Sequence, residues 1–240
     1  MEIRLGSLVD DARKAEGTVI IIDVFRAFTT AAIAFDRGAE SIVLVAEVEE
    51  AMELYCRGVG DFTMGEVDGK RPHGFDYGNS PHEISQADLV GRTIVQSTRA
   101  GTVGVAAATK AATIYLGSFV VAAATAAAVQ RDNAGVVSII AMGDRGAFRS
   151  DEDEHCALYL RNLLEGRQPD PAAVRSLVMD GGQTQKFFDD SQPQYHPQDV
   201  ELALQVNRFP FAMRISREEG LLVARKYQPT EPQGRTPRRA

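Results

Sequence analysis

The feature that most constrains the fold is an apolar run at residues 18–24, Thr-Val-Ile-Ile-Ile-Asp-Val. Its β-branched residues favour an extended strand. A strand with one face in water alternates apolar and polar side chains, but this run is apolar at consecutive positions. Such a strand is typical of the interior of a largely parallel sheet, which has helices on both of its faces. The run therefore predicts an α/β fold.

Strands and helices alternate after this run, as βα units do. The predicted strands after the first lie at residues 41–45, 93–96, 113–116 and 136–142. The predicted helices lie at residues 27–37, 48–57, 101–112, 120–131 and 151–164. Two shorter patterned segments, 200–206 and 218–223, carry weaker signals. We therefore expect a three-layer α/β/α fold with a mostly parallel or mixed central sheet.

The order of the elements is interrupted at residues 62–85, which are rich in glycine, proline and charged side chains and lack a clear period. We expect a long loop here, and loops of this length inside a compact domain are more often functional than not. A chain of 240 residues is long enough for one substantial core. We expect one domain over residues 1–227 and a flexible tail over 228–240, where prolines and arginines replace apolar periodicity.

Charge and composition narrow the functional classes. The formal net charge of −7 disfavours nucleic acid as a partner. The Ala-rich stretch 119–129 is about half the ~20 residues that a membrane span needs, so we expect no membrane partner. The chain has two cysteines far apart and no charged-then-apolar leader, which favours a cytoplasmic protein. The sequence leaves a homo-oligomer open.

Polar residues gather where three of the predicted strands end. Residues 23–26, Asp-Val-Phe-Arg, follow the first strand, and residues 97–102, Ser-Thr-Arg-Ala-Gly-Thr, follow the strand at 93–96. Gly-Asp-Arg-Gly at 143–146 and the acidic residues 151–154 follow the strand at 136–142. Ligands of open α/β sheets bind beyond the carboxyl ends of the strands. Carboxylates mixed with arginines suit a hard cation such as Mg²⁺ together with a phosphate or similar oxyanion.

Each of these segments also has a purely structural interpretation. Asp23 could cap the following helix, and the acids after Ser150 could form a helix N-terminus. Arg99 and Arg145 could be solvated surface residues, and Asn79-Ser80 could be a turn. These alternatives stay open for each segment alone. The functional interpretation gains weight because several segments are expected at the same edge of one sheet.

Four segments together resemble the 2-phosphosulfolactate phosphatase (ComB) family. Residues 22–30 are similar to the family's opening motif, and Gly65-Glu66 with the run Gly74–Pro81 and Glu83 resembles its central motif. Residues 97–102 resemble its Thr/Gly turn, and residues 143–146 with 152–157 resemble its acidic helix start. The matches keep the family's order and cover roughly residues 18–165.

The resemblance implies a Mg²⁺-dependent hydrolase that converts 2-phospho-3-sulfolactate to 3-sulfolactate and phosphate, a small and strongly anionic substrate. The residues that it implies as catalytic are Asp23, Arg26 and Asp144, and Asp23 is either a further metal ligand or the nucleophile or base. The implied substrate-binding residues are Asn79, Ser80, Ser97, Thr98, Arg99 and Arg145, the last two serving the other anionic groups. The implied metal ligands are Glu66, Asp76, Glu152 and Asp153. A phosphatase of another phospho-hydroxyacid and a non-catalytic phosphometabolite-binding module remain alternatives.

Overall fold

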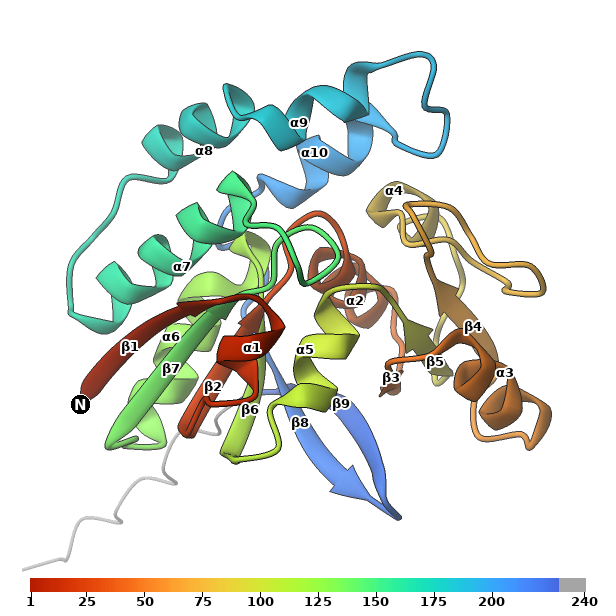
Figure 1. Ribbon diagram of the computed structural model, residues 1–240, viewed down its shortest axis with the longest axis horizontal. Coiled ribbons are helices and arrows are strands. Elements are labelled where there is room, and N and C mark those ends of the chain that lie inside the picture. The colour runs from red at the N-terminus through yellow and green to blue at the C-terminus, as the bar shows by residue number, and fades with distance from the viewer. Residues whose placement is uncertain (229–240) are drawn as a thin grey trace, which may run out of the picture.

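The computed structural model describes residues 1–228 and contains one mixed sheet with helices on both faces (Figure 1). Its strands are β1 (Glu2–Ser7), β2 (Gly17–Ile22), β3 (Ser41–Val45), β4 (Phe62–Gly65), β5 (Thr93–Ser97), β6 (Ala111–Gly117), β7 (Val136–Ala141), β8 (Ala212–Glu218) and β9 (Leu221–Tyr227). Its α-helices are α1 (Leu8–Ala12), α2 (Ala27–Asp36), α3 (Val48–Cys56), α4 (Pro81–Ile84), α5 (Gly101–Ala107), α6 (Ala122–Arg131), α7 (Asp151–Leu164), α8 (Pro171–Met179), α9 (Gly182–Gln185) and α10 (Pro197–Ala203). The 3₁₀ turns are η1 (Phe119–Val121) and η2 (Lys186–Phe188).

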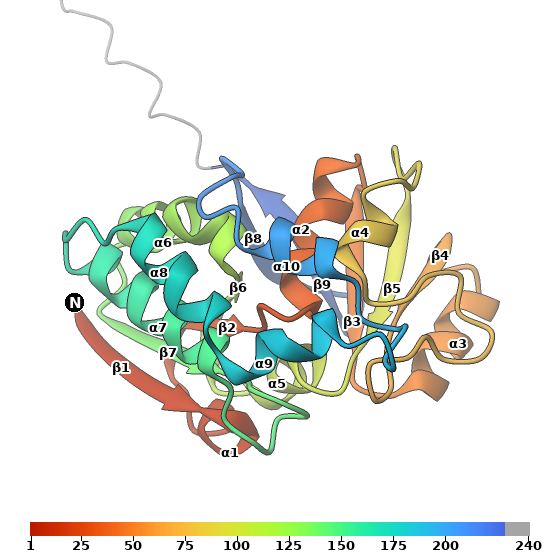
Figure 2. The same ribbon diagram turned by 90° about the horizontal axis from the view of Figure 1, so that it is seen from above.

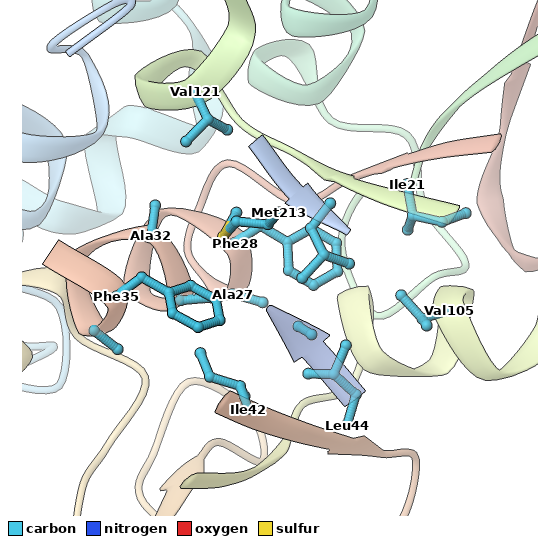
Figure 3. Close-up of a cluster of buried hydrophobic side chains, with 14 of the residues drawn as sticks. Ile21, Ala27, Phe28, Ala32, Phe35, Ile42, Leu44, Val105, Val121 and Met213 are labelled. Atoms are coloured by element: carbon cyan, nitrogen blue, oxygen red, sulfur yellow. The ribbon is translucent and has the colours of Figure 1, made fainter. Parts of the chain in front are cut away.

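The alternation of buried side chains along the strands produces the three predicted layers. In β2, Val19 and Ile21 face a cluster that contains α2 and α5, while Ile20 and Ile22 face a cluster that contains α6 and α7. The strand is buried on both faces, as its apolar run predicts. Figure 3 shows the first cluster, with α2 side chains such as Phe28 surrounded by residues of β2, β3 and β8. The prediction of a three-layer α/β fold is confirmed.

The sheet order is β1-β7-β2-β6-β8-β9-β3-β5-β4. Pairing is parallel within β1-β7-β2-β6 and within β3-β5-β4, but the β8–β9 hairpin joins the two groups through three antiparallel pairings. The two parallel groups therefore run in opposite senses along the sheet. The end of β5 still reaches the end of β2, because α5, which follows β5, packs against both β2 and β3. The expected gathering of strand ends is thus produced by packing around α2 and α5, and not by a common strand direction.

Several predicted boundaries were wrong. The predicted loop at 62–85 contains β4, which pairs with β5, and α4, which Ser80 caps through its side chain. The predicted helix 101–112 ends at Ala107, and β6 begins at Ala111. The weak segment 200–206 overlaps α10 only up to Ala203, and segment 218–223 spans the turn of the β8–β9 hairpin. The sequence prediction missed β1, α1, α8, α9 and, apart from Glu218, β8.

The predicted tail at 228–240 lies, apart from Gln228, outside the described residues. Within residues 1–228, none of the helices combines the length and the apolar character that crossing a membrane requires.

Candidate active site

A cavity of about 250 Å³ lies where the segments after β2, β4, β5 and β7 meet. In the ribbon views, α9 lies beyond the end of the sheet at which β2 leads into α2 (Figures 1 and 2). Gln183 of α9 and Lys186 of η2 line the cavity. The cavity is small compared with the roughly 300–1,000 Å³ of typical ligand sites, so it suits a small metabolite. The carboxylates that line it are Asp23, Glu66, Asp68, Asp144 and Glu152. The cationic side chains that line it are Arg26, Arg99, Arg145 and Lys186.

Asp23 stands directly after β2 and is almost fully buried at the cavity wall. Its Oδ1 accepts a hydrogen bond from the N–H of Ala27 at 3.0 Å, and its Oδ2 accepts one from the N–H of Gly101 at 2.8 Å. Burial raises the pKa of Asp23 to about 6, and the Glu66 charge acts in the same direction, while the two N–H donors oppose the shift. The capping contact therefore exists, and it coexists with a carboxyl that changes protonation near neutral pH.

Asp153 is buried behind the residues that line the cavity, in the first turn of α7. Its two oxygens accept hydrogen bonds from the N–H groups of Val24, at 2.7 Å, and Gly143, at 2.8 Å. Burial, with the negative charge of Asp23, raises its pKa well above the usual range. Asp153 thus holds together the segments that leave β2 and β7.

Glu152 differs from Asp153 because one of its oxygens has no protein partner. Its side chain is buried and lines the cavity, and within the described part of the chain Oε2 makes no hydrogen bond. The Oδ1 atom of Asn79, which also lines the cavity, is buried and unpartnered as well. Burial and the Asp153 charge raise the pKa of Glu152. Two unsatisfied oxygen acceptors at one cavity fit a cation that prefers oxygen ligands.

Among residues 1–228 no three Asp, Glu, His or Cys side chains stand close enough together to hold a metal ion by themselves. Mg²⁺ does not require such a group, because it is usually held by one or two carboxylates and several waters. Glu66 is another carboxylate that lines the cavity, and two backbone N–H groups hold it in place. Its Oε2 accepts from the N–H of Gly69 at 2.7 Å and its Oε1 from the N–H of Arg99 at 2.8 Å.

Arg26 is buried, and its guanidinium donates hydrogen bonds to three nearby acceptors. Its Nη1 donates to Asp199 Oδ2 and to the Gln194 carbonyl, both at 2.9 Å, and its Nη2 donates to the Gly69 carbonyl at 3.0 Å. Asp199 is fully buried and also accepts from the Ser80 hydroxyl at 2.6 Å. Arg26 thus links the segment after β2 to α10 and to the central loop, which is residues 66–80 between β4 and α4.

The structure brings most of the predicted site residues to the cavity. Those that line it are Asp23, Arg26, Glu66, Asn79, Arg99, Asp144, Arg145 and Glu152. Ser80 lines a neighbouring cavity of about 470 Å³ that shares Arg26, Gly69 and Asn79 with the first.

Four predicted residues do not line either cavity: Asp76, Ser97, Thr98 and Asp153. Asp76 Oδ2 instead accepts from the N–H and the hydroxyl of Thr63, which fixes the end of the central loop on β4. Thr98 exchanges hydrogen bonds with Thr102 at the start of α5.

Sequence reasoning missed the contribution of the C-terminal third. Gln183, Lys186, Gln192 and Tyr195 line the cavity, and Asp199 supports Arg26. No motif marks this segment, and the only available signal was a run of polar and aromatic residues between short helices. Asp68, in the central loop, also lines the cavity.

The sequence matches the family model described as 2-phosphosulpholactate phosphatase over residues 6–211, and every residue that lines the cavity falls in this range. A Bacillus subtilis protein named probable 2-phosphosulfolactate phosphatase is 31% identical over 202 residues, which cover 83% of this chain and 87% of the relative. A Thermoplasma acidophilum protein of the same name is 33% identical over 173 residues, or 70% of this chain and 74% of the relative. The chain therefore belongs to the 2-phosphosulfolactate phosphatase family.

Proposed function

We propose that this protein is a Mg²⁺-dependent phosphatase that hydrolyses 2-phospho-3-sulfolactate to 3-sulfolactate and phosphate. The observation that carries the proposal is that the family match spans the whole cavity, in which a buried carboxyl with a raised pKa lies together with unpartnered oxygens and cationic side chains. These are the groups that phosphoryl transfer needs, since its chemistry rests on positioning and on charge stabilisation.

Glu152 and Glu66 are the proposed metal-holding residues. Glu152 supports this role through its unpartnered Oε2, and Glu66 through its place on the same cavity. When bound, Mg²⁺ supplies charge neutralisation for the phosphoryl oxygens. Asp153 supports the site indirectly, because its hydrogen bonds to Val24 and Gly143 keep the two neighbouring strand ends together.

Asp23 is the proposed general base. A carboxyl with a pKa of about 6 is largely ionised at pH 7 and still accepts a proton readily. In the proposed reaction the Asp23 carboxylate takes a proton from an attacking water, whose oxygen bonds to phosphorus as the bond to the ester oxygen breaks. The leaving alkoxide oxygen takes up a proton from solvent to give the hydroxyl of 3-sulfolactate, and Asp23 returns its own proton to solvent. The N–H groups of Ala27 and Gly101 hold the carboxylate in one orientation throughout.

Arg99 and Arg145 are the proposed partners of the substrate's carboxylate. Each lines the cavity and is roughly half exposed, with a counter-ion that is also exposed: Glu47 for Arg99 and Asp68 for Arg145. Exposed pairs of this kind contribute only about 0–1 kcal/mol, so a substrate anion can displace them at little cost. Planar guanidinium groups match the two oxygens of a carboxylate.

A cytoplasmic setting is part of the proposal. Both cysteines, exposed Cys56 and buried Cys156, are free thiols, as is usual in a reducing compartment.

Purified protein tests the proposal by phosphate release from 2-phospho-3-sulfolactate, before and after dialysis against EDTA. We expect chelation to abolish turnover and added Mg²⁺ to restore it. Full activity after thorough chelation would contradict the metal role. Faster turnover of another phospho-hydroxyacid would assign that compound as the substrate instead. Tight binding of 2-phospho-3-sulfolactate without phosphate release would favour a binding module.

A further inference from the structure

Lys186 belongs to η2, which follows α9 directly in the chain, and it lines the cavity. Neither the sequence motifs nor the matched family description assigns it a role. Its ammonium donates to the Gln183 Oε1 at 2.9 Å and lies over the rings of Tyr195, at 5.1 Å, and Phe187, at 5.7 Å. These contacts hold the ammonium at the cavity wall, on a segment distinct from those that carry the carboxylates.

Lys186 differs from the other cations of the cavity in its partners. Arg26 is paired with buried Asp199, and Arg99 and Arg145 each have a carboxylate within 4 Å. Lys186 has a neutral amide as its hydrogen-bond partner, and within residues 1–228 no carboxylate oxygen lies within ion-pair distance of its ammonium. It is therefore the cation of this cavity whose charge is least neutralised by the protein itself.

We propose that Lys186 binds the sulfonate of the substrate and so discriminates it from phosphoesters without that group. The inference rests on the proposed function. A sulfonate is an anion with three acceptor oxygens, and the Lys186 ammonium offers them a positive charge and N–H donors that no carboxylate of the protein occupies. The Gln183 and Gln192 amides, which line the same wall, offer further neutral donors. The arginines then remain for the planar carboxylate.

The position of Lys186 relative to the reacting groups supports this assignment. Its charge acts on Asp23 across the cavity, in the direction that lowers the pKa of that carboxyl. Lys186 lines the same cavity as the proposed base Asp23, and the proposed metal-holding residues also stand on other segments. When the phosphoryl group occupies Asp23, as the proposed function requires, Lys186 is available to another anionic group of the same small substrate.

The test compares Lys186→Gln and Lys186→Arg with the wild type on three esters: 2-phospho-3-sulfolactate, 2-phospholactate and p-nitrophenyl phosphate. Lys226→Gln is the matched control, because Lys226 also lies over an aromatic ring, that of Phe211, but outside the cavity. We expect Lys186→Gln to raise KM for the sulfonated ester by about 30- to 100-fold, the scale for losing one partner of a charge pair, with much smaller effects on the other esters. Lys186→Arg should recover most of the loss, and Lys226→Gln should match the wild type.

Calorimetric titration with 3-sulfolactate provides a readout that does not depend on turnover. We expect Lys186→Gln to weaken its binding by a similar factor. An equal loss of Lys186→Gln on all three esters would assign Lys186 to the phosphoryl group. An unchanged KM and unchanged binding would leave it a structural role, and either result overturns the inference. If the wild type does not hydrolyse the sulfonated ester, the proposed function fails. The titration then still decides on Lys186: weaker binding by the variant supports the role, and equal or no binding overturns it.

Discussion

Replacing Asp23 with Asn separates its chemical role from its capping role. The substitution loses a hydrogen bond but also removes a buried charge, and these two changes affect the free energy of unfolding in opposite directions. The variant keeps one carbonyl oxygen for either Ala27 or Gly101, and turns an NH₂ group toward the other N–H. An unpaired buried donor costs about 1–3 kcal/mol. Against this, the variant removes a buried charge. The rise of the Asp23 pKa from 3.8 to about 6 corresponds to about 3 kcal/mol of lost stability at pH 7.

The two contributions nearly offset each other, so we expect the free energy of unfolding at pH 7 to stay within about 2 kcal/mol of the wild type. The balance changes with pH. Because the folded state binds the Asp23 proton more tightly than the unfolded chain, this group stabilises the wild type as the pH falls through 6 toward 4. Between pH 7 and pH 5 the gain is about 1.3 kcal/mol, and the Asn variant lacks it.

Activity should behave differently from stability. We expect kcat to fall at least about a hundredfold, the scale for losing a general base, and the wild-type kcat to rise with pH through about 6. Urea denaturation of metal-free protein at pH 5 and pH 7 and steady-state kinetics are measured on the same preparations. A variant with kcat within threefold of the wild type would leave Asp23 as a cap alone. An identical pH dependence of stability in both proteins would show that the pKa of Asp23 is not raised.

Three further outcomes are expected. A Cβ on Gly65 would overlap the backbone of β5, so Gly65→Ala should cost more than about 2 kcal/mol, whereas Gly135→Ala, which meets open space, should stay within about 0.5 kcal/mol in the same denaturation assay. Asp199→Asn leaves the buried Arg26 charge without its counter-ion and should cost about 3–5 kcal/mol, a fall in Tm of roughly 10 °C by calorimetry; an unchanged Tm would mean that Arg26 finds another partner. Removing residues 228–240, which lack apolar periodicity, should leave both Tm and kcat/KM unchanged, and a drop of several degrees would contradict this.

The sequence predicted those strands whose side chains are buried on both faces, because such strands have a recognisable run of apolar residues. The run that became β2 is apolar on both faces, and the predicted ends of β3 and α7 coincide with the observed ones. The missed strands owe their pairing to distant partners. β1, with only partly buried or exposed residues, is an edge strand beside β7, and β4 is four residues long beside β5. Short edge strands carry little periodicity of their own, so neighbouring strands decide where they form.

The candidate site could be predicted where residues follow strong strands, and not where tertiary packing brings them in. Asp23, Arg99 and Glu152 were found because each comes just after a clear strand or at the start of a clear helix. Lys186 and Asp199 were not, because α9, η2 and α10 are short and their place over the cavity depends on packing against η1, α4 and α7. The local pattern of apolar and polar residues does not indicate which distant elements a segment will contact.

Three carboxylates at or next to the cavity share one arrangement, in which a structural role and a functional role are compatible. Asp23, Glu66 and Asp153 each accept backbone N–H donors on both oxygens, and most of those donors come from other segments of the chain. Such bonds fix the side chains and also fix the loops, yet each oxygen retains a second lone pair for a cation, water or substrate proton. An amide at any of these positions turns a donor toward a donor, so even the isosteric replacement disturbs the loops. Stability and activity must therefore be measured together before a loss of turnover at this site is assigned to chemistry.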